Sequence, residues 1–203
     1  MDTVVHTAAL LHIVNPPPEL REKYERVNIG GTATVVEAAI KAGVKRVVLF
    51  STIAVYGPSD GRVLHEMSPT HPDTFYAQTK RAAEQIVLNA KGADGQPLGT
   101  VLRLGAVYGS RIKGNYERLT RALAGNLGTQ YQFHGNLGTR SQFLAKLGHV
   151  PKLPIIPPVT RAIIDKYTED IAVDGSLIQK ELGFVPQYDL KAGWEETIRE
   201  MQA

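Results

Sequence analysis

One stretch, a buried strand followed by two hydroxyl residues and a Tyr-x-x-x-Lys pair, limits most strongly what this chain can fold into. Val44–Phe50 passes from alternating basic and apolar residues into a continuous apolar run, which predicts a buried strand of a parallel sheet. Ser51 and Thr52 follow at its C-terminal end, where open α/β sheets bind their ligands. Tyr76 and Lys80 stand four residues apart at the start of a helical pattern, so both are expected on one face of that helix. The stretch therefore predicts a hydroxyl, a phenol and an ammonium that meet at one edge of the sheet.

These three side chains are suited to moving a proton alongside a hydride. An ammonium favours the phenolate form of a neighbouring tyrosine, so we expect Lys80 to lower the pKa of Tyr76 towards neutrality, as a general base requires. A Tyr-x-x-x-Lys pair also occurs by chance in many helices, and a Ser-Thr pair alone can simply end a strand. Their order, with a strand before and a helix after, makes the combination more specific than either part.

In this order and spacing the segment resembles the extended short-chain dehydrogenase/reductase superfamily, specifically its NAD-dependent epimerase/dehydratase branch. UDP-glucose 4-epimerase is the best-known member of that branch. In that family a hydroxyl residue precedes a segment ending Val-Tyr-Gly, as Thr52 does here, and the Tyr-x-x-x-Lys pair follows. The resemblance implies that Thr52, Tyr76 and Lys80 are catalytic. Tyr76 would take the substrate's hydroxyl proton as a hydride passes to the nicotinamide. Lys80 would hold the cofactor's ribose, and Thr52 would hydrogen-bond the substrate oxygen.

The start of the chain resembles the strand of that family that passes under the cofactor. Asp2–Thr7 is a short apolar strand that leads into Ala8 and Ala9, and small residues there allow a ligand to approach the backbone. The resemblance assigns Ala8, Ala9 and Ser51 to cofactor binding, together with Tyr76 and Lys80. His6 is expected to be a packed residue at the end of its strand, without a catalytic role.

Two helical stretches are expected between these strands. Glu19 begins a charged helix, and Asn28 opens a second one that ends near Gly43, a plausible C-cap. The second helix is expected to bury an apolar stripe made of Ile29, Ala33, Val36 and Ile40. The family carries an Asn-Val-x-Gly-Thr pattern here, which assigns Asn28 a supporting role near the catalytic lysine and cofactor. The alternative is an asparagine that only kinks a helix between two segments.

The second half of the chain carries fewer signals. Val101–Gly109 resembles the next strand of the family, whose end borders nicotinamide and substrate, so Ala106 and Val107 are assigned to substrate binding. Ala106 stands where family members often carry an asparagine that contacts the sugar nucleotide. A stretch from Gly125 to Phe133 recurs almost unchanged ten residues later, which is too short a repeat for a solenoid.

The end of the chain resembles the end of the family's substrate domain. Ser176 and Gln179 predict a capping box, and Trp194 is expected on a last helix, Lys191–Gln202.

No Gly-x-Gly-x-x-Gly or Gly-x-x-Gly-x-x-Gly pattern occurs among the 203 residues. In the family that turn holds the pyrophosphate at a helix N-terminus. By the resemblance, the first three strands of the sheet are expected to be absent. The expected fold class is α/β: a partial, Rossmann-like, doubly wound parallel sheet in residues 1–110, with a small, shortened substrate-domain remnant in residues 111–203.

Composition narrows the class of protein. The chain has 43% hydrophobic residues, a formal net charge of +3 and no cysteine. One sizeable core is therefore possible, while disulfides and thiolate metal sites are excluded, and we expect no metal. No run of lysine and arginine is long enough to predict a nucleic-acid site, and no apolar run approaches the length of a membrane span. A soluble, cytoplasmic protein is expected.

Two classes of function follow. The first is an NAD(P)-dependent oxidoreductase, epimerase or dehydratase that acts on a hydroxyl-bearing carbon of a nucleotide sugar, with weak NAD or NADP binding because the glycine-rich turn is absent. The second is a non-catalytic remnant, an interaction module or one half of a split enzyme. In either case the edge of the Asp2–Thr7 strand is expected to be covered by a partner, in a homodimer or with another chain, or by a rearrangement of the remaining segments.

Overall fold

The computed structural model describes residues 1–13, 16–105, 107, 109 and 172–202. The chain divides into two compact units, Met1–Gly105 with Ala172–Asp174 and Ala106–Ile171 with Gly175–Ala203. The first unit carries every predicted catalytic residue. The predicted boundary at residue 110 remains a prediction.

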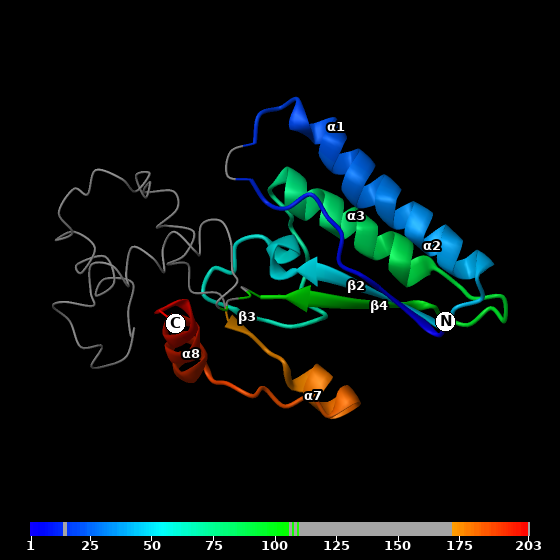
Figure 1. Cartoon of the computed structure of the whole chain (residues 1–203). Helices are drawn as coiled ribbons and strands as arrows, with labels where there is room; N and C mark the ends of the chain where they lie inside the picture. Colours follow the sequence, from blue (N-terminus) through cyan, green and yellow to red (C-terminus); the bar gives the residue numbers. More distant parts are fainter. Residues whose placement is uncertain (14–15, 106, 108, 110–171, 203) are drawn as a thin grey trace, which may run out of the picture. The chain divides into compact units, whose positions relative to one another are not determined.

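A three-stranded parallel sheet forms the centre of the first unit (Figure 1). Its strands are β1 (Thr3–His6), β2 (Arg46–Thr52) and β4 (Gly99–Leu104), in the order β1-β2-β4. β2 pairs in parallel with β1, which precedes it, and with β4, which follows it, and a helix lies between the paired strands along the chain in both cases. Parallel strands joined through helices confirm the predicted α/β class.

The central strand β2 is shifted along the chain from its predicted bounds. It begins at Arg46 instead of Val44 and includes Ser51 and Thr52. The reason is at its start, where the N–H groups of Lys45 and Arg46 both donate to the Asp2 carbonyl before regular pairing begins. Buried and half-buried residues alternate along β2, as expected for a strand with one face packed on helices.

The strand β4 is also shifted, to earlier residues. It begins at Gly99, two residues before the predicted Val101, because Val47 of β2 already bonds the Leu98 carbonyl at 2.8 Å. A side chain at Gly99 would lie 2.0 Å from the carbonyl oxygen of Val87, so glycine allows the following strand to pass close to the preceding helix. The predicted strand end at Gly109 is not reached, since β4 ends at Leu104.

One continuous helical segment replaces the two predicted N-terminal helices. α1 (Leu20–Tyr24) runs into a π-helical turn, η1 (Glu25–Gly30), and then into α2 (Gly31–Lys41), with helical backbone angles at both junctions. Gly43 has φ 65° just beyond the end, which confirms its predicted role.

The predicted apolar stripe of α2 is only partly right. Ala33 and Ile40 are exposed, whereas Thr32, Val36 and Ala39 are buried. A stripe drawn with regular α-helical spacing from Ile29 does not allow for the π-helical turn, which changes the angular position of the residues that follow it.

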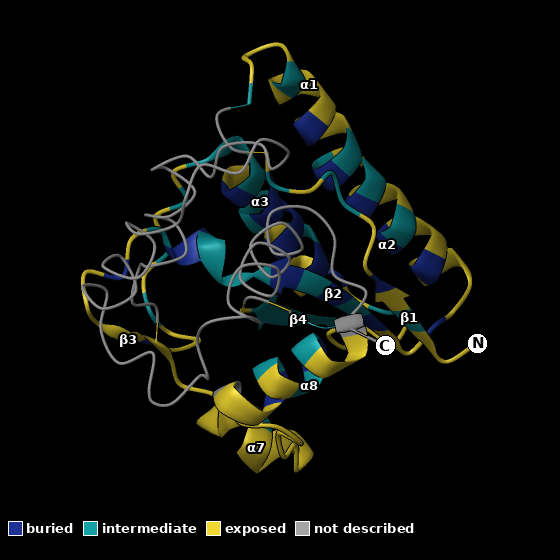
Figure 2. Cartoon of the chain, turned by 60° about the vertical axis from the view of Figure 1, so that its left-hand side comes forward, coloured by how far each residue is buried: buried dark blue, intermediate teal, exposed yellow. Residues whose placement is uncertain are grey.

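The helix α3 (Phe75–Asn89) packs beside α2 on one face of the sheet, and Figure 2 shows the buried sides of both helices turned towards the strands. Thr74 caps its start by accepting a hydrogen bond from the Ala77 N–H at 3.1 Å. The core between these layers consists of Val36, Ala39, Val44, Val47, Leu49, Ala83, Val87, Ala90 and Leu98.

The remaining described elements are short. A 3-10 turn, η2 (Ile53–Tyr56), follows β2, and β3 (Val63–Leu64) pairs in parallel with β5 (Ala172–Val173). In the second unit, α7 (Ser176–Leu182) and α8 (Leu190–Gln202) are helical, and Trp194 lies on the last helix as predicted. The predicted capping box is wrong, because Ser176 is itself the first helical residue and the cap residue Gly175 makes no side-chain cap hydrogen bond.

Three sequence features lie outside the described residues: Ala106, the two Gly-Asn-Leu-Gly-Thr stretches and the proline-rich segment near residue 155. Within the described part of the chain, no helix is both long enough and apolar enough to cross a bilayer. β1 pairs with β2 alone among the described strands, and Val5 on it is 55% exposed.

The turn after η2 allows a direct test of packing at the strand end. Gly57 and Gly61 both have positive φ, 72° and 75°, but a Cβ at Gly57 would lie 2.3 Å from the His71 carbonyl oxygen, whereas one at Gly61 would meet nothing. We expect Gly61→Ala to cost about 1 kcal/mol of unfolding free energy through backbone strain alone. Gly57→Ala should cost about 1–3 kcal/mol more, because the two chain segments must move apart. Urea denaturation measures both values, and equal losses in the two variants would contradict the close approach.

Candidate active site

Two side chains of α3 reach the end of β2 from the same side of the helix. Lys80 is 2% exposed, and its Nζ donates to the Phe50 carbonyl oxygen at 2.7 Å. One turn earlier, Tyr76 is half-buried and its phenol forms a side-chain hydrogen bond with Thr52. The structure therefore brings together the three predicted catalytic residues at the predicted place.

Thr52 is held in a fixed orientation by the turn that it begins. Its backbone is extended, and its Oγ1 accepts a hydrogen bond from the Ala54 N–H at 3.2 Å. Because Thr52 Oγ1 acts as the acceptor in that bond, the Thr52 hydroxyl proton can be donated to the Tyr76 oxygen. Thr52 is thus a donor to the phenol and a local cap at the same time.

The direction of the Tyr76 pKa shift differs from the predicted one. Burial raises the Tyr76 pKa above its ordinary value, the hydrogen bond from Thr52 opposes that rise, and Tyr24 adds a smaller upward effect. The Lys80 ammonium is instead directed at the Phe50 carbonyl oxygen. The predicted lowering of the Tyr76 pKa is therefore wrong, because the cost of burying the phenolate outweighs the hydrogen bond from Thr52.

Lys80 is itself perturbed. Burial lowers its pKa, and the negative charge of Glu84 opposes that effect. An ammonium has three donors, and one of them is used on the Phe50 carbonyl, so donors remain for a ligand at this strand end.

Asn28 connects the segment after β1 to α3. It is 1% exposed, its Oδ1 accepts from the Leu10 N–H at 2.7 Å, and its Nδ2 donates to the Leu10 carbonyl at 3.2 Å and to Thr79 Oγ1 at 3.0 Å. Thr79 precedes Lys80, so Asn28 lies where the predicted supporting role requires. It lies within the π-helical turn, a feature that occurs frequently at functional sites. Its contact with a cofactor remains a prediction.

His6 is a packed residue, as predicted. Thr32 Oγ1 donates to the Asn28 carbonyl at 2.6 Å, so the 3.1 Å contact between His6 Nε2 and Thr32 Oγ1 requires the histidine to donate from Nε2. Burial, and secondarily the charge of Lys80, lower the His6 pKa, which favours this neutral form. Ala8 is exposed and Ala9 half-buried at the end of β1, in the position predicted for residues near a cofactor.

The other predicted ligand-binding residues are Ser51, Ala106 and Val107. Ser51 is buried, and its hydroxyl donates to Glu84 Oε1 at 2.6 Å. Its predicted cofactor contact remains a prediction; with its proton given to Glu84, the Ser51 hydroxyl is left as an acceptor. Val107 is 67% exposed, and Ala106 lies outside the described residues.

Sequence reasoning missed two residues of this region, Glu84 and Arg103. Glu84 is fully buried on α3, and Arg103 donates to it from Nε at 3.0 Å and from a terminal nitrogen at 2.8 Å. The available signal was an arginine inside the apolar strand Gly99–Leu104, since a charge there requires a buried partner.

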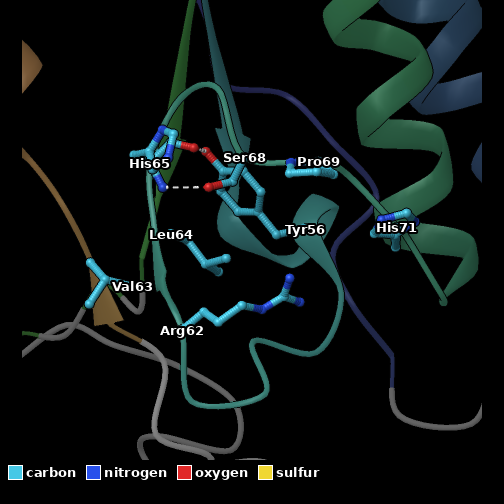
Figure 3. A pocket seen from close by; sticks show the side chains of 8 residues that line it. All are labelled: Tyr56, Arg62, Val63, Leu64, His65, Ser68, Pro69 and His71. Atoms are coloured by element: carbon cyan, nitrogen blue, oxygen red, sulfur yellow. Dashed lines mark hydrogen bonds between the residues drawn. The ribbon is translucent and has the colours of Figure 1, made fainter.

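A small cavity lies beside this region but does not include it. Its volume is about 280 Å³, and it is enclosed by the loop that follows η2, with Tyr56, Leu64 and His65 among its lining (Figure 3). The Tyr56 hydroxyl donates to the His65 carbonyl at 2.9 Å, which joins two of the lining residues. Thr52, Tyr76 and Lys80 do not line this cavity, so it is not part of the proton-transfer geometry.

Comparison with known proteins identifies the family. The sequence profile of the NAD dependent epimerase/dehydratase family matches residues 1–142. The chain belongs to this family. The match includes the whole strand–hydroxyl–Tyr-x-x-x-Lys stretch, as the motif predicted.

Individual relatives differ in the substrates that their names state. UDP-glucose 4-epimerase of Streptomyces lividans is 36% identical over 104 residues, covering 49% of this chain and 30% of the relative. 3 beta-hydroxysteroid dehydrogenase/Delta 5-->4-isomerase of Mycobacterium tuberculosis is 30% identical over 125 residues, covering 59% of this chain and 34% of the relative. The chain thus spans about a third of the length of these curated relatives.

A solved structure supports the fold. MoeE5 in complex with UDP-glucose and NAD superposes with a TM-score of 0.69 at 23% identity, over 100% of this chain and 79% of that one. At this identity the likeness establishes the Rossmann-like α/β fold of the first unit.

The hydrogen bond between Thr52 and Tyr76 gives a prediction about titration. Thr52→Val removes the hydroxyl that lowers the Tyr76 pKa, so burial acts unopposed and this pKa should rise further. The ¹³Cζ signal of labelled Tyr76, assigned with Tyr76→Phe, reports the titration. Thr100→Val, at a half-buried threonine of β4, is the control and should leave the Tyr76 titration unchanged. A Tyr76 pKa that is the same in Thr52→Val and wild type would show that the hydrogen bond does not form in solution.

Proposed function

We propose that this chain carries the proton-transfer residues of an NAD(P)-dependent epimerase, dehydratase or oxidoreductase that acts on a hydroxyl-bearing carbon of a nucleotide sugar. The observation that carries the proposal is the meeting of Thr52, Tyr76 and Lys80 at the C-terminal end of β2. A half-buried phenol with a fixed hydroxyl donor on one side and a buried ammonium one turn away has the parts needed to accept a proton in a water-poor site.

Each residue then has a defined task. Tyr76 accepts the proton of the substrate hydroxyl at its phenolic oxygen, and Thr52 donates a hydrogen bond that favours the charged form of that oxygen. The substrate oxygen would share that donor during the transfer. Lys80 binds ribose hydroxyls with the donors that Phe50 does not use.

The raised Tyr76 pKa is relevant to the substrate-binding step. At neutral pH the phenol is protonated, so the base form must be produced when ligands arrive. A positive charge close to the phenol would do this, and the nicotinamide ring of oxidised NAD carries one. When bound, that cofactor supplies the hydride acceptor.

The residues fit one end of such a cofactor. Lys80 and Thr52, together with the small residues Ala8 and Ala9 at the end of the neighbouring strand, suit the nicotinamide ribose. The sequence contains no glycine-rich turn for the pyrophosphate. A few hydrogen bonds at about 1 kcal/mol each correspond to dissociation constants on the order of 1 mM or weaker.

The substrate class rests on the relatives. The epimerase named above acts on UDP-glucose, and MoeE5 binds UDP-glucose and NAD, so a nucleotide sugar is the proposed substrate. A 3 beta-hydroxysteroid dehydrogenase is also among the relatives, so a hydroxysteroid is the comparison substrate in any assay.

The second candidate function is a non-catalytic remnant, an interaction module or one half of a split enzyme. It is supported by the lack of a glycine-rich turn within these 203 residues, because positioning of the reacting groups supplies about 7–11 kcal/mol of such a barrier. The three side chains alone cannot replace that contribution.

NAD binding and turnover separate the two candidates. We expect the 203-residue chain to bind NADH with a dissociation constant on the order of 1 mM or weaker by fluorescence titration. Any turnover of UDP-glucose with NAD should fall about a hundred- to ten-thousand-fold in Tyr76→Phe, because only the proton-transfer group is removed. Turnover that survives Tyr76→Phe would contradict the assigned base. Micromolar NADH affinity would contradict the expected weak binding. If NAD at about ten times the expected dissociation constant leaves the Tyr76 ¹³Cζ signal unchanged, the non-catalytic alternative is favoured.

We also propose that another copy of the chain pairs with the free edge of β1. Among the described strands that edge has no partner, and Val5 beside it is exposed. Sedimentation velocity should show a dimer, which Val5→Lys should dissociate because a lysine on an edge strand opposes pairing. Val63→Lys, at an equally exposed valine of β3, is the control and should stay dimeric. A wild-type monomer at high concentration would contradict this proposal.

A further inference from the structure

A fully buried carboxylate lies one helical turn beyond the catalytic lysine. Glu84 is 0% exposed and Lys80 is 2% exposed, and both project from α3 towards β2. The two side chains contact consecutive residues of that strand, since Lys80 bonds the Phe50 carbonyl and Glu84 bonds the Ser51 hydroxyl. The catalytic helix is therefore attached to the strand end by two adjacent charged anchors.

The carboxylate of Glu84 is held on both oxygens. Oε1 accepts from Ser51 Oγ at 2.6 Å and from Arg103 Nε at 3.0 Å, while Oε2 accepts from Arg103 at 2.8 Å and from Arg81 at 3.2 Å. A two-pronged arginine contact fixes a carboxylate in orientation as well as in place.

The sheet itself places these partners. Ser51 of β2 and Arg103 of β4 are direct neighbours in the parallel register, so both side chains project from the same face onto Glu84. Arg103 is further held by the Tyr56 ring, 4.8 Å from its guanidinium carbon. Burial alone would lower the pKa of the Arg103 guanidinium. Its contacts with Glu84 and Tyr56 outweigh that effect and raise the pKa, so Arg103 stays charged.

From this geometry we propose that Glu84 is a positioning residue for Lys80. Held by Ser51 and Arg103, it places a fixed negative charge one turn from the Lys80 ammonium and so keeps that ammonium charged at the strand end. The inference deepens the proposed function and rests on it. A lysine buried this completely would otherwise tend to lose its proton, and a neutral amine would be a poorer partner for a phenolate and for ribose hydroxyls.

The charges that face Lys80 come from several elements. His6 projects from β1, Tyr76 and Glu84 lie on α3, and Arg103 on β4 acts through Glu84. His6 is a neutral donor in this arrangement, so Glu84 is the negative charge in the set. Arg81, which is 30% exposed and also bonds Glu84, partly offsets that charge.

Two substitutions with opposite expected signs test the proposal. Glu84→Gln removes the negative charge with little change in shape, so the Lys80 pKa should fall. Arg81→Gln removes a competing positive charge at a partly exposed position, so the Lys80 pKa should rise, and this variant should fold even if Glu84→Gln does not. The ¹³Cε signal of labelled Lys80, assigned with Lys80→Met, reports both titrations without cofactor or turnover.

Linkage gives a second readout. Because the folded Lys80 pKa is lower than in the unfolded chain, the unfolded chain binds more protons between the two values, and the unfolding free energy should rise with pH in that window. This pH window should be narrower in Arg81→Gln, where the folded Lys80 pKa rises towards the unfolded value. It should be wider in Glu84→Gln, where the folded Lys80 pKa falls further. Glu37→Gln, at an exposed carboxylate paired with Lys41, is the matched control and should change neither readout.

The outcomes separate the two proposals. Opposite shifts of the Lys80 pKa in Glu84→Gln and Arg81→Gln support the positioning role, whether or not the chain turns over a substrate. If the Lys80 pKa is unchanged in Arg81→Gln, Glu84 has only a structural role as an ion-pair partner. This conclusion holds whether or not Glu84→Gln loses stability. Turnover that is insensitive to Tyr76→Phe would overturn the proposed function and leave these titrations unaffected.

Discussion

The attachment of α3 to the end of β2 is the constraint on which the rest of this unit depends. Tyr76, Lys80 and Glu84 are spaced four residues apart, and each meets one of the last three residues of β2. Two of these contacts bury a charge, and a buried charge is tolerated only where its partners are complete. Removing one partner of such a set typically costs about 3–5 kcal/mol, so the helix has little freedom to slide along the strand.

A second set of polar contacts fixes the segment that follows β1. Asn28 bonds both backbone groups of Leu10, and the buried Tyr24 hydroxyl donates to the Leu11 carbonyl at 2.8 Å while accepting from the Ile13 N–H at 3.1 Å. Both residues come from the continuous helix that contains the π-helical turn. The backbone that follows β1 is thereby held by the same helical layer that packs on the core, and Asn28 connects it directly to α3 through Thr79.

These two sets of contacts fix the end of the sheet without any ligand. Thr52, Tyr76 and Lys80 are buried or half-buried, and the contacts that fix them involve no substrate. Relatives of this chain are named for sugar-nucleotide and for steroid substrates. A common core that aligns a hydroxyl, a phenol and an ammonium is compatible with either, because such side chains recognise the reacting C–O–H group and leave the rest of the substrate to other parts of the protein.

The sequence by itself determined the parallel sheet, the strand end and the alignment of Tyr76 with Lys80, because these follow from local periodicity: apolar runs for strands and a spacing of four for one helical face. Only the tertiary structure decided which polar groups are buried together. Ser51 and Glu84 are 33 residues apart, and Asn28 and Thr79 are 51 apart, so no local pattern relates them. The direction of the Tyr76 pKa shift was decided in the same way, since it depends on how much water the packed layers exclude and on where the Lys80 ammonium finds its acceptor.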